Sequence, residues 1–190
     1  MKKLTLILLV LLMAITVVSC KKEKTDAPAG MKEVSNGAED FQLFVPEKWE
    51  VDRADRGMIM VHVPETDGDD VDAGMSNLSL TCQDYPFDND KYKTAEDYYV
   101  KYVDGEYKAQ IQGNFHDAEF ESVEKCEIDG KEGRSLVFTA TVGENVYKYK
   151  QVFVVGPNAT IYIFTYTSSV ERFDNHIKNL DKIIAEFRFL

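Results

Sequence analysis

Apolar and polar residues alternate along much of the chain beyond residue 40, which is the pattern of strands that bury one face. Phe41, Leu43 and Val45 follow this period of two, and Leu78 and Leu80 repeat it farther along. On this pattern we predict strands over residues 41–45, 49–51, 58–63, 78–82, 120–128, 134–142, 147–155 and 160–167.

Two other stretches carry apolar residues at helical spacing. The first runs from residue 94 to about residue 112, because Thr94 and Asp97 resemble a capping box at its start. The second runs toward the C-terminus, with Ser168 or Ser169 as its N-cap. Its apolar stripe comprises Val170, Phe173, Ile177, Leu180, Ile183, Ile184 and Phe187.

The last two strands are apolar on both faces, unlike strands at a solvated surface. In the first of them Tyr149 and Phe153 point to one face, whereas Val152 and Val154 point to the other. Such strands lie in the centre of a sheet that is covered on both sides. The strands follow one another as hairpins, which makes their pairing antiparallel. We therefore predict an α+β fold in which an antiparallel sheet is sandwiched between helices, with a helix on each face.

Four short patterns mark the order of these elements. They are Phe41-x-Leu43-x-Val45-Pro46-x-x-Trp49, Asn77-Leu78-Ser79-Leu80, Gly130-x-x-Gly133-Arg134, and a closing helix that ends at Phe187. Together they resemble the PsbP-like fold family, which includes the DcrB-like bacterial lipoproteins, over about residues 38 to 189. The resemblance implies a PsbP-like α/β/α sandwich over 38–190. It also implies an accessory or binding role, since the characterised members help to assemble or regulate other proteins, and it assigns no binding residue.

The first residues have the features of an export signal. A positively charged start precedes an apolar stretch over 4–18, and Val17-Val18-Ser19-Cys20 resembles a bacterial lipobox. We predict a lipoprotein signal peptide over 1–19, cleavage between Ser19 and Cys20, and attachment of a diacylglyceryl group to Cys20. An ordinary signal peptide and an uncleaved anchor helix are the alternatives, although a membrane-spanning helix needs about 20 apolar residues.

Lipidation at this position predicts where the chain works. The domain would lie outside the cytoplasm, in a bacterial cell envelope, with the lipid holding it on a membrane. Residues 20–37 would be the lipidated cysteine and a flexible tether, because 21–30 contain no large apolar side chain. The expected partners are the membrane, through the N-terminal lipid, and another envelope protein.

Composition narrows the functional classes. The chain has 190 residues, enough for one domain with its appendages rather than for two independent cores. Its formal charge is −11, and from residue 31 onward 17 basic and 31 acidic side chains give a charge of −14. Such a surface repels phosphate backbones, so we expect no nucleic-acid binding. Three cysteines are too few for a scaffold that disulfides hold together.

The most acidic segment is the stretch 65–74 between two predicted strands. Carboxylates at alternate positions can converge on calcium. The EF-hand pattern fails, however, because Asp72 stands where glycine is required and Val71 occupies a ligand position. We therefore expect a solvated loop, with no metal and no other cofactor, and a specific cation site is the alternative. Further carboxylates nearby in the sequence are Asp84, Asp88 and Asp90.

The positions of the histidines and cysteines are explained without a metal or catalytic site. The spacing of His62, His116 and His176 does not match the paired histidines of a zinc site, so we expect each at the surface or at an edge. Cys82 and Cys126 lie on separate predicted strands of an exported domain, which leaves a disulfide open. Burial as free thiols is the other interpretation, and the alternation that Cys82 continues favours it.

No motif marks an active site, and we expect no catalytic residue. No serine lies in a Gly-x-Ser-x-Gly turn, and no glycine-rich phosphate loop follows a strand. Tyr147, Tyr149, Tyr162 and Tyr166 either line a groove on one sheet face or, as we favour, pack beneath a helix. The leading hypothesis is a lipid-anchored, non-catalytic accessory protein that binds another envelope protein. The alternatives are a lipoprotein that binds a small ligand or cation, and an envelope enzyme.

Overall fold

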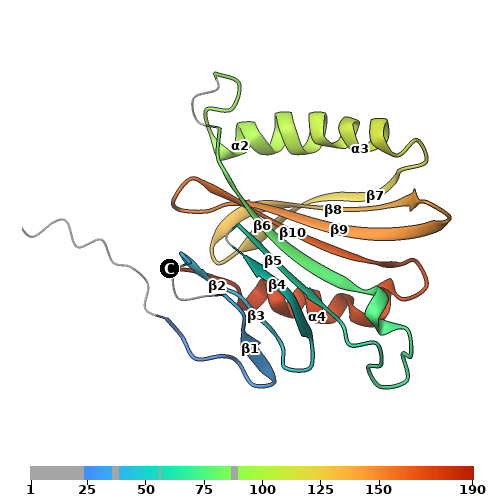
Figure 1. Ribbon diagram of the computed structural model, residues 1–190. Helices are drawn as coiled ribbons and strands as arrows, with labels where there is room; N and C mark the ends of the chain where they lie inside the picture. The colour runs from blue at the N-terminus through green and yellow to red at the C-terminus, as the bar shows by residue number, and fades with distance from the viewer. Residues whose placement is uncertain (1–23, 36–38, 56, 87–89) are drawn as a thin grey trace, which may run out of the picture.

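A seven-stranded antiparallel sheet forms the centre of the molecule (Figure 1). The computed structural model describes residues 24–35, 39–55, 57–86 and 90–190. In spatial order the strands are β4 (Glu50–Asp55), β5 (Met58–His62), β6 (Asn77–Asp84), β10 (Thr160–Ser169), β9 (Asn145–Val155), β8 (Lys131–Val142) and β7 (Glu119–Ile128). The chain leaves β6 in the middle, crosses one face as a helical segment, and returns from the β7 edge through three hairpins to β10.

One helical layer covers each face of this sheet, as Figure 1 shows. The continuous segment α2 (Ala95–Asp97), η2 (Tyr98–Tyr107) and α3 (Lys108–Asn114) covers one face, and α4 (Phe173–Glu186) covers the other. The predicted α+β sandwich is therefore confirmed. A short 3₁₀ turn, η1 (Ala73–Met75), precedes β6.

The two strands that are apolar on both faces, β9 and β10, are indeed central in the sheet. Val152 and Val154 belong to the core beneath α4, whereas Phe153 belongs to the core beneath η2. Phe164 lies opposite Val152 in the β10–β9 register, so the same alternation continues across strands. Both cores depend on these two strands, because each strand supplies apolar side chains to both faces of the sheet.

The first predicted helix forms where the capping residues place it. The Thr94 hydroxyl accepts a hydrogen bond from the Asp97 backbone N–H at 3.1 Å, which is the N-cap interaction. The helix then widens into a π-helix over Tyr98–Tyr107 before it narrows again. Helical periodicity did not predict this π-helix, because π-helices are rare and an α-helix is the ordinary interpretation of such spacing.

The start of the last helix differs from the prediction. Ser168 and Ser169 belong to β10, and α4 begins only after Arg172. Ser168 is buried and shares a 2.7 Å hydrogen bond between hydroxyls with Ser76, so it cannot cap a helix. Val170 is also wrongly placed in the stripe, since it is exposed. Of the remaining stripe, the buried members are Phe173, Leu180, Ile183 and Phe187, and the half-buried ones are Ile177 and Ile184.

The strand predicted over 41–45 is split into two. β2 (Phe41–Gln42) pairs with β11 (Arg188–Phe189), and β3 (Phe44–Pro46) pairs with β1 (Met31–Glu33). Every side chain from 41 to 45 is buried, including Gln42, so the expectation of one solvated face is wrong. The polar Gln42 is accommodated because it exchanges hydrogen bonds with the backbone of Thr25.

That contact also corrects the extent of the predicted tether. Residues 31–33 form β1, and Met31 is buried in the core. Thr25 is held by Gln42, and Ala29 accepts a hydrogen bond from the Lys182 ammonium at 3.3 Å. The signal peptide, Ser19, Cys20 and residues 20–23 and 36–37 of the tether lie outside the described residues. Within the part of the chain that the structure describes, no helix is long and apolar enough to span a membrane.

Candidate functional site

The acidic loop folds against the first turns of α4 rather than standing free in solvent. Its tip closes on itself, because the backbones of Asp67 and Asp70 exchange two hydrogen bonds of 3.2 Å. Gly68 adopts a φ of +66° at this tip, a conformation that glycine accepts without steric strain. From this turn the Asp70 side chain reaches α4, where Asn175 and His176 donate hydrogen bonds to it.

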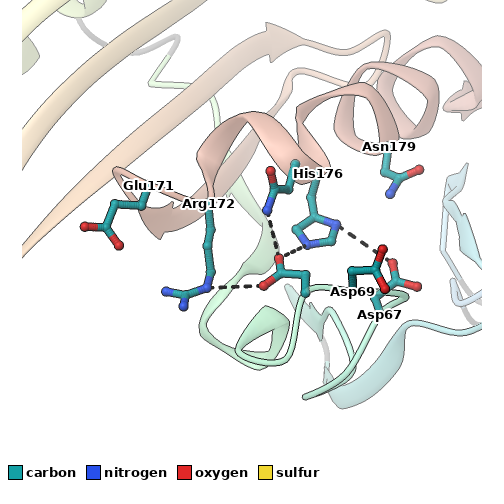
Figure 2. A pocket seen from close by; sticks show the side chains of 8 residues that line it. Asp67, Asp69, Glu171, Arg172, His176 and Asn179 are labelled. Atoms are coloured by element: carbon teal, nitrogen blue, oxygen red, sulfur yellow. Dashed lines mark hydrogen bonds and ion pairs between the residues drawn. The ribbon is translucent and has the colours of Figure 1, made fainter.

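Three side chains of α4 and its N-cap converge on Asp70 (Figure 2). Arg172 Nε lies 3.3 Å from one carboxylate oxygen, while Asn175 Nδ2 and His176 Nε2 lie 3.1 Å and 3.0 Å from the other. These donors stand at positions i, i+3 and i+4, so a single helical turn presents all of them to one carboxylate. Arg172 also pairs with Asp72.

The surroundings of Asp70 favour its ionised form. Burial alone raises the pKa of Asp70, but hydrogen bonds from Asn175 and His176 outweigh burial and hold the pKa below its ordinary value of 3.8. His176 Nδ1 also lies 3.9 Å from Asp67 Oδ2, so this ring stands between two carboxylates. The expectation that His176 lies at the surface is wrong, because its side chain is only 4% exposed.

Between the loop and α4 lies an acidic pocket of about 610 Å³ that is open to solvent. Asp67, Asp69 and Glu171 line it together with the residues around Asp70, as Figure 2 shows. Among the described residues no group of three or more His, Cys, Asp or Glu side chains is placed to hold a metal ion. The carboxylates of Asp70 and Asp72 bind side chains of α4 and its N-cap. These contacts attach the β5–β6 connection to the helix. Of the other nearby carboxylates, Asp84 ends β6, Asp90 is exposed, and Asp88 lies outside the described residues.

A second groove of about 400 Å³ adjoins this pocket and is more apolar. Its apolar lining consists of Met75, Val146, Tyr147 and Val170. We call this hollow the distal groove. Met75, Val146 and Val170 are 47%, 51% and 47% exposed, so the distal groove gathers apolar surface that faces water. Glu171 and Arg172 line both hollows, which makes the two continuous.

The other two histidines lie where the sequence places them. His62 is on β5, partly exposed, with its Nε2 atom 3.2 Å from Glu50. His116 is exposed in the connection between α3 and β7. In the described part of the chain, neither belongs to a group of three or more His, Cys, Asp or Glu side chains that could hold a metal ion.

The disulfide interpretation of Cys82 and Cys126 is wrong. Cys82 is on β6 and Cys126 on β7, with β10, β9 and β8 between them. Four inter-strand spacings amount to roughly 19 Å, far beyond the reach of a disulfide. Both thiols are free and half-buried. Burial, with the charges of Glu39 and Asp40, raises the pKa of Cys82 to about 12, so this thiol stays protonated at neutral pH.

The four tyrosines do not share one face. Tyr162 and Tyr166 are fully buried beneath α4, where the Tyr166 hydroxyl donates to the Phe173 carbonyl at 3.3 Å. Tyr149 lies on the opposite face and stacks on Phe138 at 4.9 Å between ring centroids. Packing beneath a helix is thus the correct interpretation for Tyr162 and Tyr166, and also for Tyr149, which packs against the cluster that contains Ile111 of α3. Tyr147 instead lines the distal groove, so the four tyrosines do not form one common groove.

The Arg134 side chain joins β8 to the helical layer, a role that the sequence pattern around it did not predict. Its guanidinium is 4% exposed and contacts Glu96 at 3.1 Å, Asp104 at 3.3 Å and Glu132 at 2.8 Å. It also lies 4.9 Å from the centroid of the Tyr99 ring. In the sequence, Arg134 stands out only as the end of the pattern Gly130-x-x-Gly133-Arg134. That spacing does not predict that its acidic partners Glu96 and Asp104 lie on the helical layer.

Comparison with solved structures shows the same fold in proteins of diverged sequence. The cyanobacterial PsbP of Synechocystis sp. PCC 6803 matches with a TM-score of 0.59 at 17% identity, covering 89% of this chain and 98% of that one. PA94, a protein of unknown function from Pseudomonas aeruginosa, matches with a TM-score of 0.57 at 13% identity, over 82% and 94% of the two chains. The Saccharomyces cerevisiae Ran-binding protein Mog1p also scores 0.57, at 7% identity, over 84% and 95%.

A search of curated proteins found no match. The sequence model of the PsbP-like protein family, however, matches residues 15–189, nearly the whole chain. The match includes the central sheet, both helical layers and the acidic loop. With its sandwich architecture and this match, the chain belongs to the PsbP-like protein family.

Proposed function

We propose that this chain is a lipid-anchored, non-catalytic accessory protein of the bacterial cell envelope that acts by binding another envelope protein. The observation that carries the proposal is the exposed apolar surface of the distal groove. Exposed apolar side chains that gather in one place, with a polar rim, are typical of protein interaction sites. An enclosed apolar cavity with convergent polar groups would instead favour a small ligand.

The arrangement of ionisable groups supports a non-catalytic role. Arg134 holds the helical layer on β8, and Arg172 with His176 holds the acidic loop on α4, so these groups stabilise the fold by engaging one another. Both described cysteine thiols are half-buried, and the pKa of Cys82 is raised by burial, which disfavours a reactive thiolate. Mog1p, a Ran-binding protein by name, provides a fold-level analogy for a binding role.

The sequence supports the location. A lipobox-like Val17-Val18-Ser19-Cys20 follows an apolar stretch at the N-terminus. The first described residues are held beside the C-terminal half of α4 through Ala29 and Lys182, which gives the proposed anchor a defined point of departure from the domain.

Cross-linking in intact cells tests the proposal. Cells that carry an affinity-tagged full chain are treated with a membrane-permeant, lysine-reactive cross-linker. The tagged chain is then purified under denaturing conditions, and mass spectrometry identifies the protein that is cross-linked to it. We expect one predominant product with a second envelope protein. That product should be lost for Cys20→Ser, which removes the proposed anchor. A chain that remains monomeric in wild-type membranes, across a range of cross-linker concentrations, would contradict the proposed function.

A further inference from the structure

Negative charge surrounds the distal groove. Glu144 lines the groove itself, Glu171 lies where it meets the acidic pocket, and Asp67 and Asp69 continue the same surface. Among the described residues that line the two hollows, the basic ones are Arg172 and His176, and both are already engaged: Arg172 by Asp70 and Asp72, and His176 by Asp70. The charge that remains for a partner is therefore negative, beside side chains that are apolar and exposed.

The distal groove lies at the end of the sandwich away from the described N-terminal residues. Its residues come from η1, from the start of β9, and from the turn between β10 and α4, at the right of Figure 1. The described N-terminal residues, blue in Figure 1, lie at the other end, where Ala29 contacts Lys182 on the C-terminal half of α4. α4 has 14 residues and so separates the two ends by roughly 20 Å. A surface so placed stands clear of the proposed membrane anchor.

We infer that the distal groove and the acidic pocket together bind a segment of a partner protein in which an apolar residue stands next to lysine or arginine. The apolar side chain is buried against Val146 and Val170, and the basic side chain reaches Glu171 and Asp69. This inference rests on the proposed function and names its surface and the chemistry of its partner. Apolar contact supplies the affinity, and the carboxylates select the partner and its orientation.

Charge argues against the two other occupants of such a surface. A second copy of this chain would bring the same acidic rim and a domain charge of −14 to the contact, so like charges would oppose it. Anionic lipid headgroups would be repelled by Glu144, Glu171 and Asp69 for the same reason. A basic protein segment is the occupant that complements both the apolar and the acidic parts.

The first experiment measures binding of synthetic peptides to the full lipidated chain in nanodiscs of zwitterionic lipid. Three peptides of equal length carry leucine flanked by lysine and arginine, serine in place of the leucine, or glutamate in place of the basic residues. We expect saturable binding of the first alone. Val146→Thr keeps the shape of the side chain and should weaken this binding by about tenfold, which corresponds to about 1.4 kcal/mol.

Matched variants control for indirect effects. Val100 on η2 is 51% exposed, like Val146, so Val100→Thr should leave binding unchanged. Glu171→Lys should abolish binding, whereas Glu124→Lys, at an exposed position of β7, should not. Thermal melting of each variant establishes that it is folded. Equal binding of all three peptides, or equal effects of the groove and control variants, would overturn the inference.

A second experiment separates failure of the surface from failure of the function. The photo-cross-linker p-benzoylphenylalanine replaces Val146 or Val100 in the full chain in intact cells. We expect a cross-link to another protein from position 146 only, and the cross-linked peptide should contain an apolar residue beside lysine or arginine. A partner captured from position 100 alone leaves the accessory function standing and overturns the surface. A homodimer or a lipid adduct at 146 overturns it too, and no protein product at either position counts against both.

Discussion

Asp70 is the residue on which the contact between the acidic loop and α4 depends. One carboxylate accepts hydrogen bonds from Arg172, Asn175 and His176, and it is 13% exposed. Hydrogen bonds to charged groups contribute about 1.5–3 kcal/mol when they are shielded from water. We expect Asp70→Asn to lower the free energy of unfolding at pH 7 by about 1–3 kcal/mol. Urea denaturation measures this change, and the exposed neighbour Asp69, changed to asparagine, should show almost none.

The same residue predicts a dependence on pH. The pKa of Asp70 is lower in the folded chain than in the unfolded chain, so the ionised carboxylate stabilises the fold above about pH 4. This stabilisation is lost as the pH falls from there through the lowered pKa of the folded state. The difference between the wild-type chain and Asp70→Asn should therefore shrink as the pH falls from 5 to below 3. A difference that stays constant over that range would show that the carboxylate charge does not contribute.

Gly133 is required by close packing between two strands. A Cβ atom at this position would lie 2.5 Å from the Phe153 carbonyl oxygen and 3.2 Å from Cys126 Sγ. Because Phe153 is paired with β8 on one side and with β10 on the other, its backbone cannot shift without disturbing strand pairing. We expect Gly133→Ala to destabilise the domain by about 1–3 kcal/mol, as overpacking does. Gly113→Ala is the control, since open space surrounds Gly113 on α3 and alanine should stabilise that helix by up to about 1 kcal/mol. Thermal unfolding of both variants decides.

At the scale of the elements, α4 is attached to the sheet by a row of side chains of unequal burial. Leu180 is fully buried, whereas Ile177 is half-buried. Leu180→Ala should cost about 2–5 kcal/mol, because it leaves a cavity in the core beneath α4. Ile177→Ala should cost clearly less, since water already reaches part of that side chain. Equal losses for the two variants in denaturant unfolding would mean that the helix packs in a different rotation about its axis, and Lys178→Ala, at an exposed position, sets the baseline.

At the scale of the whole molecule, the proposed lipid anchor predicts that the domain works at a membrane surface. Two acyl chains contribute about 0.8 kcal/mol for each buried methylene and so hold a protein on a bilayer stably, whereas one chain does not. We expect mass spectrometry to find a mature chain that begins at Cys20 and carries a diacylglyceryl thioether. Cys20→Ser should yield an uncleaved precursor or a misprocessed soluble protein that incorporates no labelled palmitate. An unmodified Cys20, or cleavage elsewhere, would contradict the lipoprotein assignment and the membrane location with it.

The central sheet and its two helical layers could be predicted from the sequence, because local patterns of apolar and polar residues determine them. The two-sided apolar character of β9 and β10 can be satisfied only at the centre of a covered sheet, and the N-cap of Thr94 depends on a residue three positions away. The predicted start of α4 at Ser168 or Ser169 was wrong for a reason beyond any local pattern. Ser168 contacts Ser76, a residue 92 positions earlier in the chain, and that contact keeps it in β10.

The candidate site is made almost entirely of such distant contacts. By itself the sequence determined the acidity of the loop, the apolar stripe of α4, the antiparallel sandwich and the family resemblance, since composition and periodicity are properties of neighbouring residues. Only the tertiary structure decided that Asp70 meets His176 across 106 positions, and that Met75, Val146 and Val170 line one groove. It also decided that Cys82 and Cys126 stand too far apart to pair. The physical reason is that strand order and helix placement follow from burying the whole core at once, and no single segment encodes which distant side chains that burial brings together.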